Sequence, residues 1–286
     1  MKIAVNTRLL LKDKLEGIGW YTYETLSRIV KSHPEHEFFF IFDRPYSDEF
    51  IFEKNVFPIV LGPTSRHPIL WHIWFELRIP KLLKKLNIDL FLSPDGFLSL
   101  ASKTPSIAVI HDINFEHNPK DLKFSHSKFY RFFFKKYAHK ARRIVTVSNY
   151  SKLDISNVYE INKTKIDVSL NGVNPLFHPI GLSEQMNIRK QYSQGKDYFL
   201  FVGALHPRKN IKRLLVAFDL FKTETKSKNK LLIVGAKMWW NTELEEAFEN
   251  ISHKDEVVFT GRKPLPELQL LYASAQAFCF VPYFEG

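Results

Sequence analysis

The chain has 286 residues, a formal net charge of +11 and 45% apolar residues, which suffices for two globular domains with hydrophobic cores. Cys279 is the only cysteine, which excludes a disulfide framework and a cysteine-ligated metal cluster. No apolar leader follows Met1, and the longest uncharged run, 268–284, contains polar residues. We therefore expect a cytoplasmic protein without a membrane span.

The first half alternates short apolar runs with helical patterns, which is typical of an α/β fold with parallel sheets. The expected strands are 2–6, 38–43, 90–95, 106–112, 143–149 and 165–172. Between 177 and 198 the pattern lapses and Pro, Gly and Ser accumulate, which indicates a domain boundary. We therefore expect a first domain of residues 1–178 and a second of residues 179–286.

The second half repeats the alternation with four strands and three helices. The expected strands are 198–204, 230–236, 257–261 and 277–283, and the expected helices are about 210–222, 242–250 and 265–275. In the usual strand order of a doubly wound sheet, further strands would lie beyond the last one. We therefore expect the segment 277–283 to lie at an apolar sheet edge, in a domain that is incomplete.

Two glycines follow the first strand in the motif EGIGWY, at Gly17 and Gly19. Glycines let the backbone approach a ligand closely, and the helix that follows offers N–H donors to an anion. A tight strand-to-helix turn is the alternative interpretation of this motif.

The motif VGALHPRKN places two cations, Arg208 and Lys209, between a strand and a helix, with Asn210 as the expected N-cap. Two cations beside a helix N-terminus form a site suited to a diphosphate, at the strand end where such folds bind ligands. The alternative is that both charges are solvated on a loop. Gly203 in this motif is a further candidate for a cleft.

His111 and Asp112 come at the end of the expected strand 106–112. The histidine could donate a hydrogen bond to a substrate hydroxyl or transfer a proton, although a lone histidine is commonly structural. Neighbours in a strand point to opposite faces, which argues against a His–Asp catalytic pair. Asn171 and Gly172, in a glycine turn after a strand, are further cleft candidates, with a simple turn as the alternative.

Two stretches combine aromatic and basic residues, 69–86 and 124–143, and both could form helices with one apolar face, the first kinked or started at Pro80. The segment 120–143 contains nine basic residues and one acid, Asp121. This segment could dock at an anionic membrane surface, while core packing with a solvated basic face is the alternative. It contains no recognisable nucleic-acid-binding module, so we expect no nucleic-acid partner.

Taken in chain order, these motifs resemble the retaining group 1 (family 4) glycosyltransferases of the GT-B fold, especially their mannosyltransferase-like members. The resemblance covers nearly the whole chain and runs through EGIGWY, SPDGF, VIHDINFEHNP, VTVSNYS, NGVNPLF, FVGALHPRKN, LLIVGA, FTGR and PYFEG. It implies two Rossmann-like domains facing a cleft, with a nucleotide-diphosphate sugar mainly on the second and a glycan or lipid-linked acceptor mainly on the first. The implied reaction transfers a sugar, for example mannose, with retention in cell-surface polysaccharide synthesis.

The resemblance also implies roles for individual residues. Arg208 and Lys209 would hold the donor diphosphate, and His111 would bond a sugar hydroxyl near the reacting carbon. Gly17 and Gly19 would lie where the first loop meets donor and acceptor. No cofactor and no metal is expected, because cationic side chains and a helix terminus neutralise the leaving diphosphate.

Glu285 matches the first Glu of the family's Glu-x7-Glu motif, which contacts the donor sugar, and the sequence ends one residue later at Gly286. Without the second Glu, two hydrogen bonds to the ribose would be lost, at a cost of about 3–6 kcal/mol. We therefore expect a C-terminally truncated relative with weak or absent activity. The alternative function is a catalytically impaired protein that binds an acceptor or depends on a partner.

Overall fold

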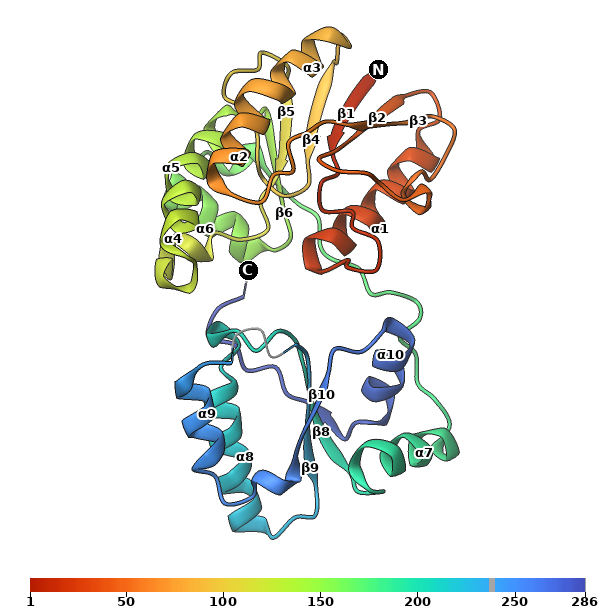
Figure 1. The fold of residues 1–286 in the computed structure, drawn as a ribbon, viewed down its shortest axis with the longest axis vertical. Helices are drawn as coiled ribbons and strands as arrows, with labels where there is room; N and C mark the ends of the chain where they lie inside the picture. The colour runs from red at the N-terminus through yellow and green to blue at the C-terminus, as the bar shows by residue number, and fades with distance from the viewer. Residues whose placement is uncertain (237–239, 286) are drawn as a thin grey trace. The chain divides into compact units, whose positions relative to one another are not determined.

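A computed structural model describes residues 1–236 and 240–285 and divides the chain into two compact units, Met1–Asn171 and Gly172–Glu285 (Figure 1). Each unit is a parallel sheet with helices, so the predicted α/β class is confirmed. The predicted domain boundary at 178 lies slightly later in the chain than this division. Phe177 packs edge to face on Tyr272, with ring centroids 5.5 Å apart, which ties this segment to the second unit.

The first unit contains a seven-stranded parallel sheet in the order β3-β2-β1-β4-β5-β6-β7. Its strands are β1 (Lys2–Asn6), β2 (Glu37–Phe42), β3 (Val56–Val60), β4 (Leu90–Ser93), β5 (Ser106–Val109), β6 (Arg143–Thr146) and β7 (Ile166–Val168). β3, whose sequence VFPIV contains Pro58, was not among the predicted strands. A proline cannot donate to the ladder, but β3 is an edge strand, where this loss is tolerated.

Helices cover both faces of this sheet. They are α1 (Gly17–Ser32), η1 (Asp48–Phe50), α2 (Pro68–His72), η2 (Ile73–Arg78), α3 (Ile79–Lys85), α4 (Asn114–His117), η3 (Pro119–Asp121), α5 (Phe124–Lys140), α6 (Asn149–Tyr159) and η4 (Lys163–Lys165). Alternate strand residues serve the two faces: Val5 packs in one core with α1, and Ala4 in the other with α5 and α6.

The aromatic stretch 69–86 is helical, as expected, but it is not one regular helix. It runs as α2, then a π-helical turn, η2, and then α3, in which Pro80 occupies the first turn. Proline has no N–H to donate to the preceding turn of a helix. The irregular π turn directly before Pro80 accommodates this missing hydrogen bond. Trp74 and Phe75 in the π turn are fully buried and anchor the core on this face.

The second unit contains a four-stranded parallel sheet in the order β10-β9-β8-β11. Its strands are β8 (Tyr198–Val202), β9 (Lys230–Val234), β10 (Val257–Gly261) and β11 (Ala277–Phe278), and its helices are α7 (Leu182–Ser193), η5 (Pro207–Lys209), α8 (Ile211–Thr225), α9 (Thr242–Glu249), η6 (Lys254–Glu256) and α10 (Leu265–Ser274). Residues of α8 and α9 pack on one face, and residues of α7 and α10 on the other, as Figure 1 shows.

The last predicted strand, 277–283, is too long. β11 includes only Ala277 and Phe278, at the expected edge beside β8. The chain beyond it turns toward the loop after β8: the Val281 carbonyl accepts from the Asn210 side chain, and the Tyr283 N–H donates to the Arg208 carbonyl. The Cys279 N–H still donates to the Leu200 carbonyl of β8 at 2.7 Å, whereas the backbone groups of Val281 and Tyr283 bond to the loop after β8 instead.

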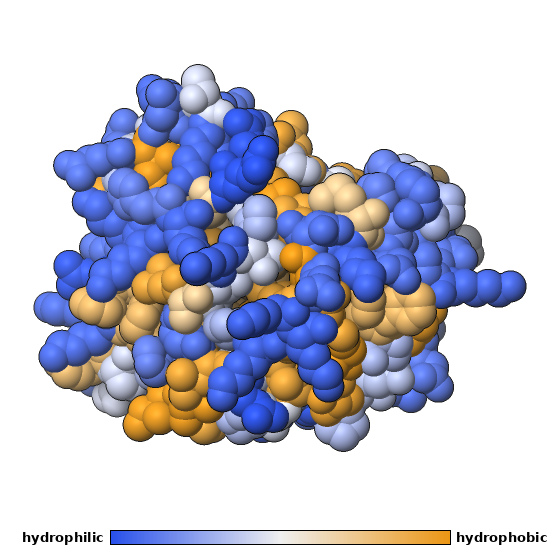
Figure 2. Space-filling model, turned by 90° about the horizontal axis from the view of Figure 1, so that it is seen from above, coloured by the Kyte–Doolittle hydropathy of each residue, from blue (hydrophilic) through white to orange (hydrophobic). Residues whose placement is uncertain are grey.

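Hydrophilic residues cover much of the surface in Figure 2, and apolar residues form separate patches among them. Within residues 1–236 and 240–285, no helix combines the length and the apolar character needed to cross a membrane.

Candidate active site

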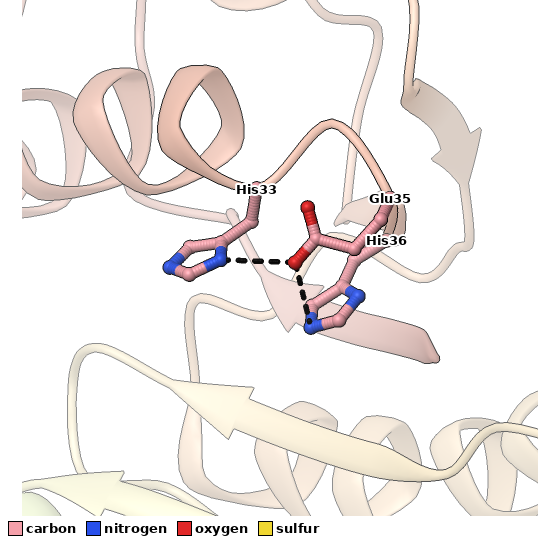
Figure 3. A group of neighbouring side chains, drawn as sticks. All are labelled: His33, Glu35 and His36. Carbon is pink, nitrogen blue, oxygen red and sulfur yellow. Dashed lines mark hydrogen bonds and ion pairs between the residues drawn. The ribbon is translucent and has the colours of Figure 1, made fainter.

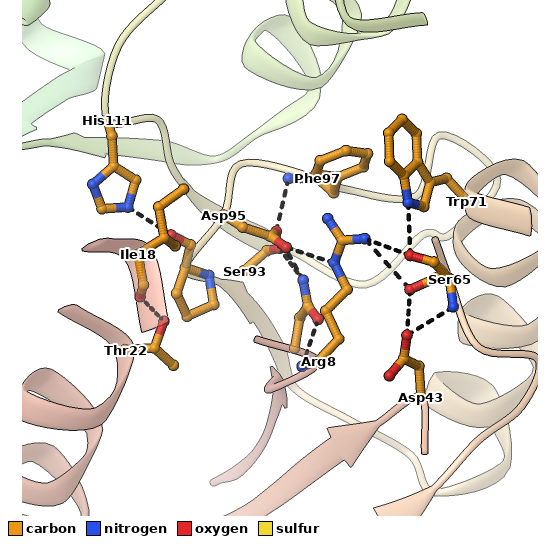
Figure 4. Close-up of polar contacts among 12 residues, drawn as sticks. Arg8, Ile18, Thr22, Asp43, Ser65, Trp71, Ser93, Asp95, Phe97 and His111 are labelled. Carbon is orange, nitrogen blue, oxygen red and sulfur yellow. Dashed lines mark hydrogen bonds and ion pairs between the residues drawn. The ribbon is translucent and has the colours of Figure 1, made fainter. Parts of the chain in front are cut away.

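A polar network joins the carboxyl ends of β1 and β4 in the first unit (Figure 4). The Asn6 amide donates to Ser93 Oγ at 3.0 Å and to Asp95 Oδ1 at 2.8 Å. Arg8 Nε donates to Asp95 Oδ2 at 2.7 Å, and only 7% and 4% of these two side chains is exposed. Carboxyl ends of parallel strands meet at one edge of the sheet, so residues distant in sequence converge there.

The Arg8 guanidinium is enclosed by aromatic rings, with its carbon 4.3 Å from the centroid of Phe97 and 5.4 Å from that of Phe75. Its Nη1 also donates to the Ser65 carbonyl at 3.3 Å. The Ser65 N–H and hydroxyl donate in turn to Asp43, at 2.7 and 2.8 Å. These contacts fix one orientation of the guanidinium in the interior.

Asp43 is ionised within this network. Burial works against its charge, but hydrogen bonds from Arg44 and from the Ser65 N–H and hydroxyl hold the pKa of Asp43 below its ordinary value. The network therefore contains two buried carboxylates around one buried guanidinium, with Arg44 as the second cation.

Arg8 and Asp95 were not among the predicted site residues, although Asp95 belongs to the motif SPDGF. The available signal was the placement of polar residues directly after β1 and β4, in NTR and SPDG. Gly96 in the second segment has φ +81°, and a Cβ there would lie 2.9 Å from the Phe134 ring. The turn that carries Asp95 thus requires glycine.

His111 lies beside this turn. Its Nε2 is 2.8 Å from the Pro94 carbonyl oxygen, and its ring packs edge to face on Tyr21, with centroids 4.8 Å apart. A carbonyl only accepts, so Nε2 carries the proton and Nδ1 of the neutral ring is an acceptor. Burial lowers the pKa of His111, an effect only partly offset by the Pro94 carbonyl and by Asp112 and Asp95.

The predicted strand through His111 and Asp112 ends earlier, at Val109. The expectation that these two side chains point to opposite faces of a strand is therefore wrong, because neither residue lies in the strand. Asp112 Oδ1 accepts from the Asn114 N–H at 2.9 Å, which serves the local turn into α4. The His111 ring thus bonds the Pro94 carbonyl, while the Asp112 carboxylate bonds the Asn114 N–H, so the two side chains have different partners.

The two glycines of EGIGWY open α1 and differ in their surroundings. A Cβ at Gly19 would lie 3.0 Å from the Leu9 carbonyl oxygen and 3.2 Å from the Leu15 side chain, whereas a Cβ at Gly17 would meet nothing within 4 Å. Packing against the loop after β1 therefore explains Gly19. The structure gives no packing reason for Gly17, and the ligand role predicted for both glycines stays a prediction.

In the second unit, the two predicted cations converge on the predicted acid. Arg208 Nη1 lies 2.6 Å and Lys209 Nζ 2.5 Å from the same oxygen of Glu285. Arg208 and Lys209 form η5, at the carboxyl end of β8, while Glu285 follows β11. Between 16% and 31% of each of the three side chains is exposed, so the cluster is accessible to a ligand.

Asn210 occupies the N-cap position of α8, but the predicted capping bond is absent in this described segment. The residue has φ +61°, and its side chain donates to the Val281 carbonyl at 3.0 Å instead. The left-handed backbone, which asparagine tolerates well, makes the turn between η5 and α8.

The other cleft candidates lie in two places. Gly203 has φ +155° and lies so close to Gly235 that a Cβ on Gly235 would be 1.9 Å from the Gly203 carbonyl oxygen. The close approach of the ends of β8 and β9 therefore requires glycine at 235, and the backbone conformation favours glycine at 203. Asn171 and Gly172 are exposed where the two units divide. Gly286, the last residue of PYFEG, lies outside the described residues.

Two family models match the chain. The model described as "Glycosyltransferase Family 4" matches residues 15–176, more than half of the chain. The chain belongs to glycosyltransferase family 4. The model described as "Glycosyl transferases group 1" matches residues 184–286. The predicted family, enzyme class and GT-B fold class are thus confirmed for this chain, while the predicted roles of single residues remain predictions.

Two curated relatives of this family 4 glycosyltransferase are mannosyltransferases. The chain is 23% identical over 302 residues to O-antigen chain mannosyltransferase B of Escherichia coli, covering 100% of this chain and 77% of that protein. It is 28% identical over 247 residues to O-antigen chain mannosyltransferase RfbU of Salmonella typhimurium (strain LT2), covering 82% of this chain and 64% of that protein.

A solved structure shares the fold. The crystal structure of Anabaena Alr3699/HepE in complex with UDP-glucose matches with a TM-score of 0.68 at 15% sequence identity, over 99% of this chain and 74% of that chain. At this identity the likeness concerns the fold of the family 4 glycosyltransferase and not its substrate.

Replacing Asp95 by alanine in this glycosyltransferase should destabilise the first unit strongly. The change leaves the Arg8 guanidinium buried without its carboxylate, which typically costs about 3–5 kcal/mol. Urea unfolding of wild type and variant measures the difference. Asp167→Ala is the matched control, because Asp167 pairs with Arg143 at the surface, with 52% and 44% of the two side chains exposed. The idea of a buried anchor is wrong if both variants unfold at the same urea concentration.

His111 should make the first unit less stable as the pH falls below about 6.5, the ordinary histidine pKa. Its folded-state pKa is lowered by burial, so between that value and about 6.5 the unfolded state binds more protons and acid favours unfolding. Urea midpoints at several pH values measure this dependence. In His111→Gln the loss below pH 6.5 should be smaller than in wild type, while the exposed control His178→Gln should keep the wild-type slope. Equal slopes for wild type and His111→Gln would refute the buried neutral state.

Proposed function

We propose that the chain transfers a sugar from a nucleotide-diphosphate donor to a glycan or lipid-linked acceptor, with retention, in the synthesis of a cell-surface polysaccharide. The observation that carries this proposal is the convergence of Arg208 and Lys209 on Glu285 at the carboxyl end of β8. Diphosphates require paired cations, and the sugar to be transferred requires a polar side chain beside them.

The cluster has a charge balance that favours a diphosphate. Two cations share one carboxylate oxygen, which leaves one net positive charge on the three side chains. A diphosphate supplies further anionic oxygens for the donors of Arg208 and Lys209, and the guanidinium can bond two of them at once. Glu285 then becomes available to accept hydrogen bonds from sugar hydroxyls. The cations stabilise the charge that develops on the leaving diphosphate, without a metal ion in this scheme.

His111 serves the same reaction in the first unit as a hydrogen-bond acceptor. Its Nε2–H is held by the Pro94 carbonyl, so Nδ1 of the neutral ring accepts from a sugar hydroxyl. A positively charged ring could not accept this bond, and burial favours the neutral ring. The loop from Ser93 to Gly96, fixed by the Arg8 network, thereby orients the histidine through Pro94.

Mannose is the proposed sugar, because the two curated relatives are named mannosyltransferases that act on O-antigen chains. The complex of the solved relative with UDP-glucose supports the donor class, a nucleotide-diphosphate sugar. GDP-mannose is therefore the donor to use in the first assay.

Arg208→Ala should weaken the binding of both GDP and GDP-mannose roughly tenfold to a hundredfold, because a charge-assisted hydrogen bond contributes about 1.5–3 kcal/mol.

Glu285→Gln should bind GDP at least as tightly as wild type, since both cations lose their internal partner, but should transfer less mannose. Calorimetry measures binding, and release of GDP from GDP-mannose measures turnover. Lys212→Ala is the matched control, because Lys212 is exposed and pairs with Glu243 instead.

Retention is tested in the same assay by recording the anomer of the mannose released to water, which should be that of the donor. GDP-mannose binding without any turnover would favour the alternative function, a catalytically impaired protein that binds its ligands or depends on a partner. Failure of Arg208→Ala to weaken GDP binding would refute the diphosphate site.

We further propose that α5 docks on an anionic membrane, in agreement with a lipid-linked acceptor and a cytoplasmic protein at the inner membrane face. Four residues spaced by one helical turn form an exposed stripe: Phe124, Lys128, Phe132 and Lys136. The two phenylalanines are 75% and 58% exposed. Each lysine lies over a phenylalanine, at 4.7 Å for Lys128 over Phe124 and 3.4 Å for Lys136 over Phe132. Exposed aromatic rings flanked by lysines suit an interface with anionic headgroups.

Sedimentation with vesicles tests this docking. Wild type should bind vesicles that contain phosphatidylglycerol better than pure phosphatidylcholine vesicles, and each lysine near the surface should contribute about 1 kcal/mol, or roughly fivefold in affinity. The double variant Phe124→Ser/Phe132→Ser should lose most of the binding. Leu220→Ser, at a 57% exposed position on α8, is the matched control. Equal binding of wild type to both kinds of vesicle would contradict the proposal.

A further inference from the structure

A second group of polar side chains lies at the opposite edge of the first sheet, where α1 ends and β2 begins (Figure 3). Both His33 and His36 direct a ring nitrogen at one oxygen of Glu35. The distances are 3.1 Å from His33 Nδ1 and 3.6 Å from His36 Nε2. The three ligand atoms all lie within 4.8 Å of one another. No metal was expected from the sequence, and this group was not among the predicted site residues.

These separations suit a transition-metal ion. Zinc bonds imidazole nitrogen and carboxylate oxygen at about 2.0–2.2 Å, so two ligand atoms of a tetrahedral site are about 3.3 Å apart. The two distances to Glu35 lie on either side of this value. Two imidazoles and one carboxylate are also a ligand set that divalent zinc, copper, nickel and iron accept.

The side chains are arranged to close around an ion with small movements. The two imidazole rings are stacked, with centroids 5.6 Å apart and planes inclined by 11°. Between 26% and 59% of each side chain is exposed, so water can complete the coordination. Surface contacts of this kind between a histidine and a carboxylate contribute little to the stability of a fold, so rearranging them around an ion costs little.

The backbone under the group is held in place. The Asn55 amide donates to three carbonyl oxygens, those of Val30, His33 and His36, each at 3.1 Å. The His36 N–H also donates to the His33 carbonyl at 3.2 Å. This bracing fixes the short turn between α1 and β2, so little backbone entropy is lost when an ion binds.

We propose that His33, Glu35 and His36 form a surface site for one divalent transition-metal ion, with Zn²⁺ as the reference ion. The site lies at the amino edge of the sheet, next to the start of β1, whose carboxyl end leads to Arg8. β1 is roughly 13 Å long, and this length separates its start, beside the His33 group, from its carboxyl end, which leads to Arg8. The proposed ion site is therefore separate from the Arg8 network.

Calorimetric titration of the untagged chain with Zn²⁺ tests the proposal. One ion should bind per chain, and His33→Ala, Glu35→Gln and His36→Ala should each weaken binding by at least about tenfold, since even loss of an outer-shell partner typically costs this much. His178→Ala, at an exposed histidine of the second unit, should bind Zn²⁺ like wild type. Bound Co²⁺ should show the visible absorption of a tetrahedral ion, and the three variants should lose it.

The variants change exposed or half-buried surface side chains, so their urea midpoints without metal should be close to that of wild type, which separates loss of the site from loss of the fold. Wild-type affinity for Zn²⁺ in the combined variant His33→Ala/His36→Ala would overturn the proposal. GDP-mannose binding by His33→Ala should be unchanged, so failure of the metal site and failure of the proposed transferase function are distinguishable.

Discussion

The buried charge of Arg8 constrains the whole carboxyl edge of the first sheet. A guanidinium in the interior is tolerable only if a carboxylate and further acceptors surround it, and here Asp95 and Ser65 supply them. Asp95 in turn fixes the turn after β4, whose Pro94 carbonyl holds His111. A single electrostatic requirement thus links the ends of β1, β4 and β5. Because removing one member leaves the others unpaired, the residues act as a unit.

The second unit organises its polar residues differently. Its charges lie near the surface, on η5 and on the segment after β11, and they compensate one another through the shared oxygen of Glu285. Because solvent screens these charges, rearranging them changes the free energy little. Disturbing the buried network of the first unit raises the free energy much more. The two units therefore combine a rigid support for His111 with a cation cluster that a ligand can reorganise.

Much of the fold could be predicted because buried parallel strands appear as short apolar runs between helical patterns. The misses have local causes: β3 contains Pro58, and β11 stops where Asn210 and Arg208 engage the backbone. The cations of η5 were predictable as a charged pair before a helix. Their convergence with Glu285 was suggested by family resemblance and could not follow from spacing, because 76 residues separate Lys209 from Glu285.

The Arg8 network and the His33 group were not predicted, because each polar residue in them is unremarkable alone. The residues of the Arg8 network come together only because the strand order places Asn6 next to Ser93. Those of the His33 group come together only because one turn directs two histidines at one carboxylate. Sequence patterns report which face of an element is apolar, but they do not report which polar side chains share an edge.

The contacts between η5 and the segment after β11 couple two pieces of chain that are distant in sequence. Tyr283 and Val281 bond to the backbone of Arg208 and the side chain of Asn210, so neither piece can detach without breaking bonds to the other. Shared hydrogen bonds of this kind favour opening of the two pieces as one cooperative unit in local unfolding. A ligand that bonds to either piece restricts the other, and part of its binding energy is spent on ordering a segment that it does not touch.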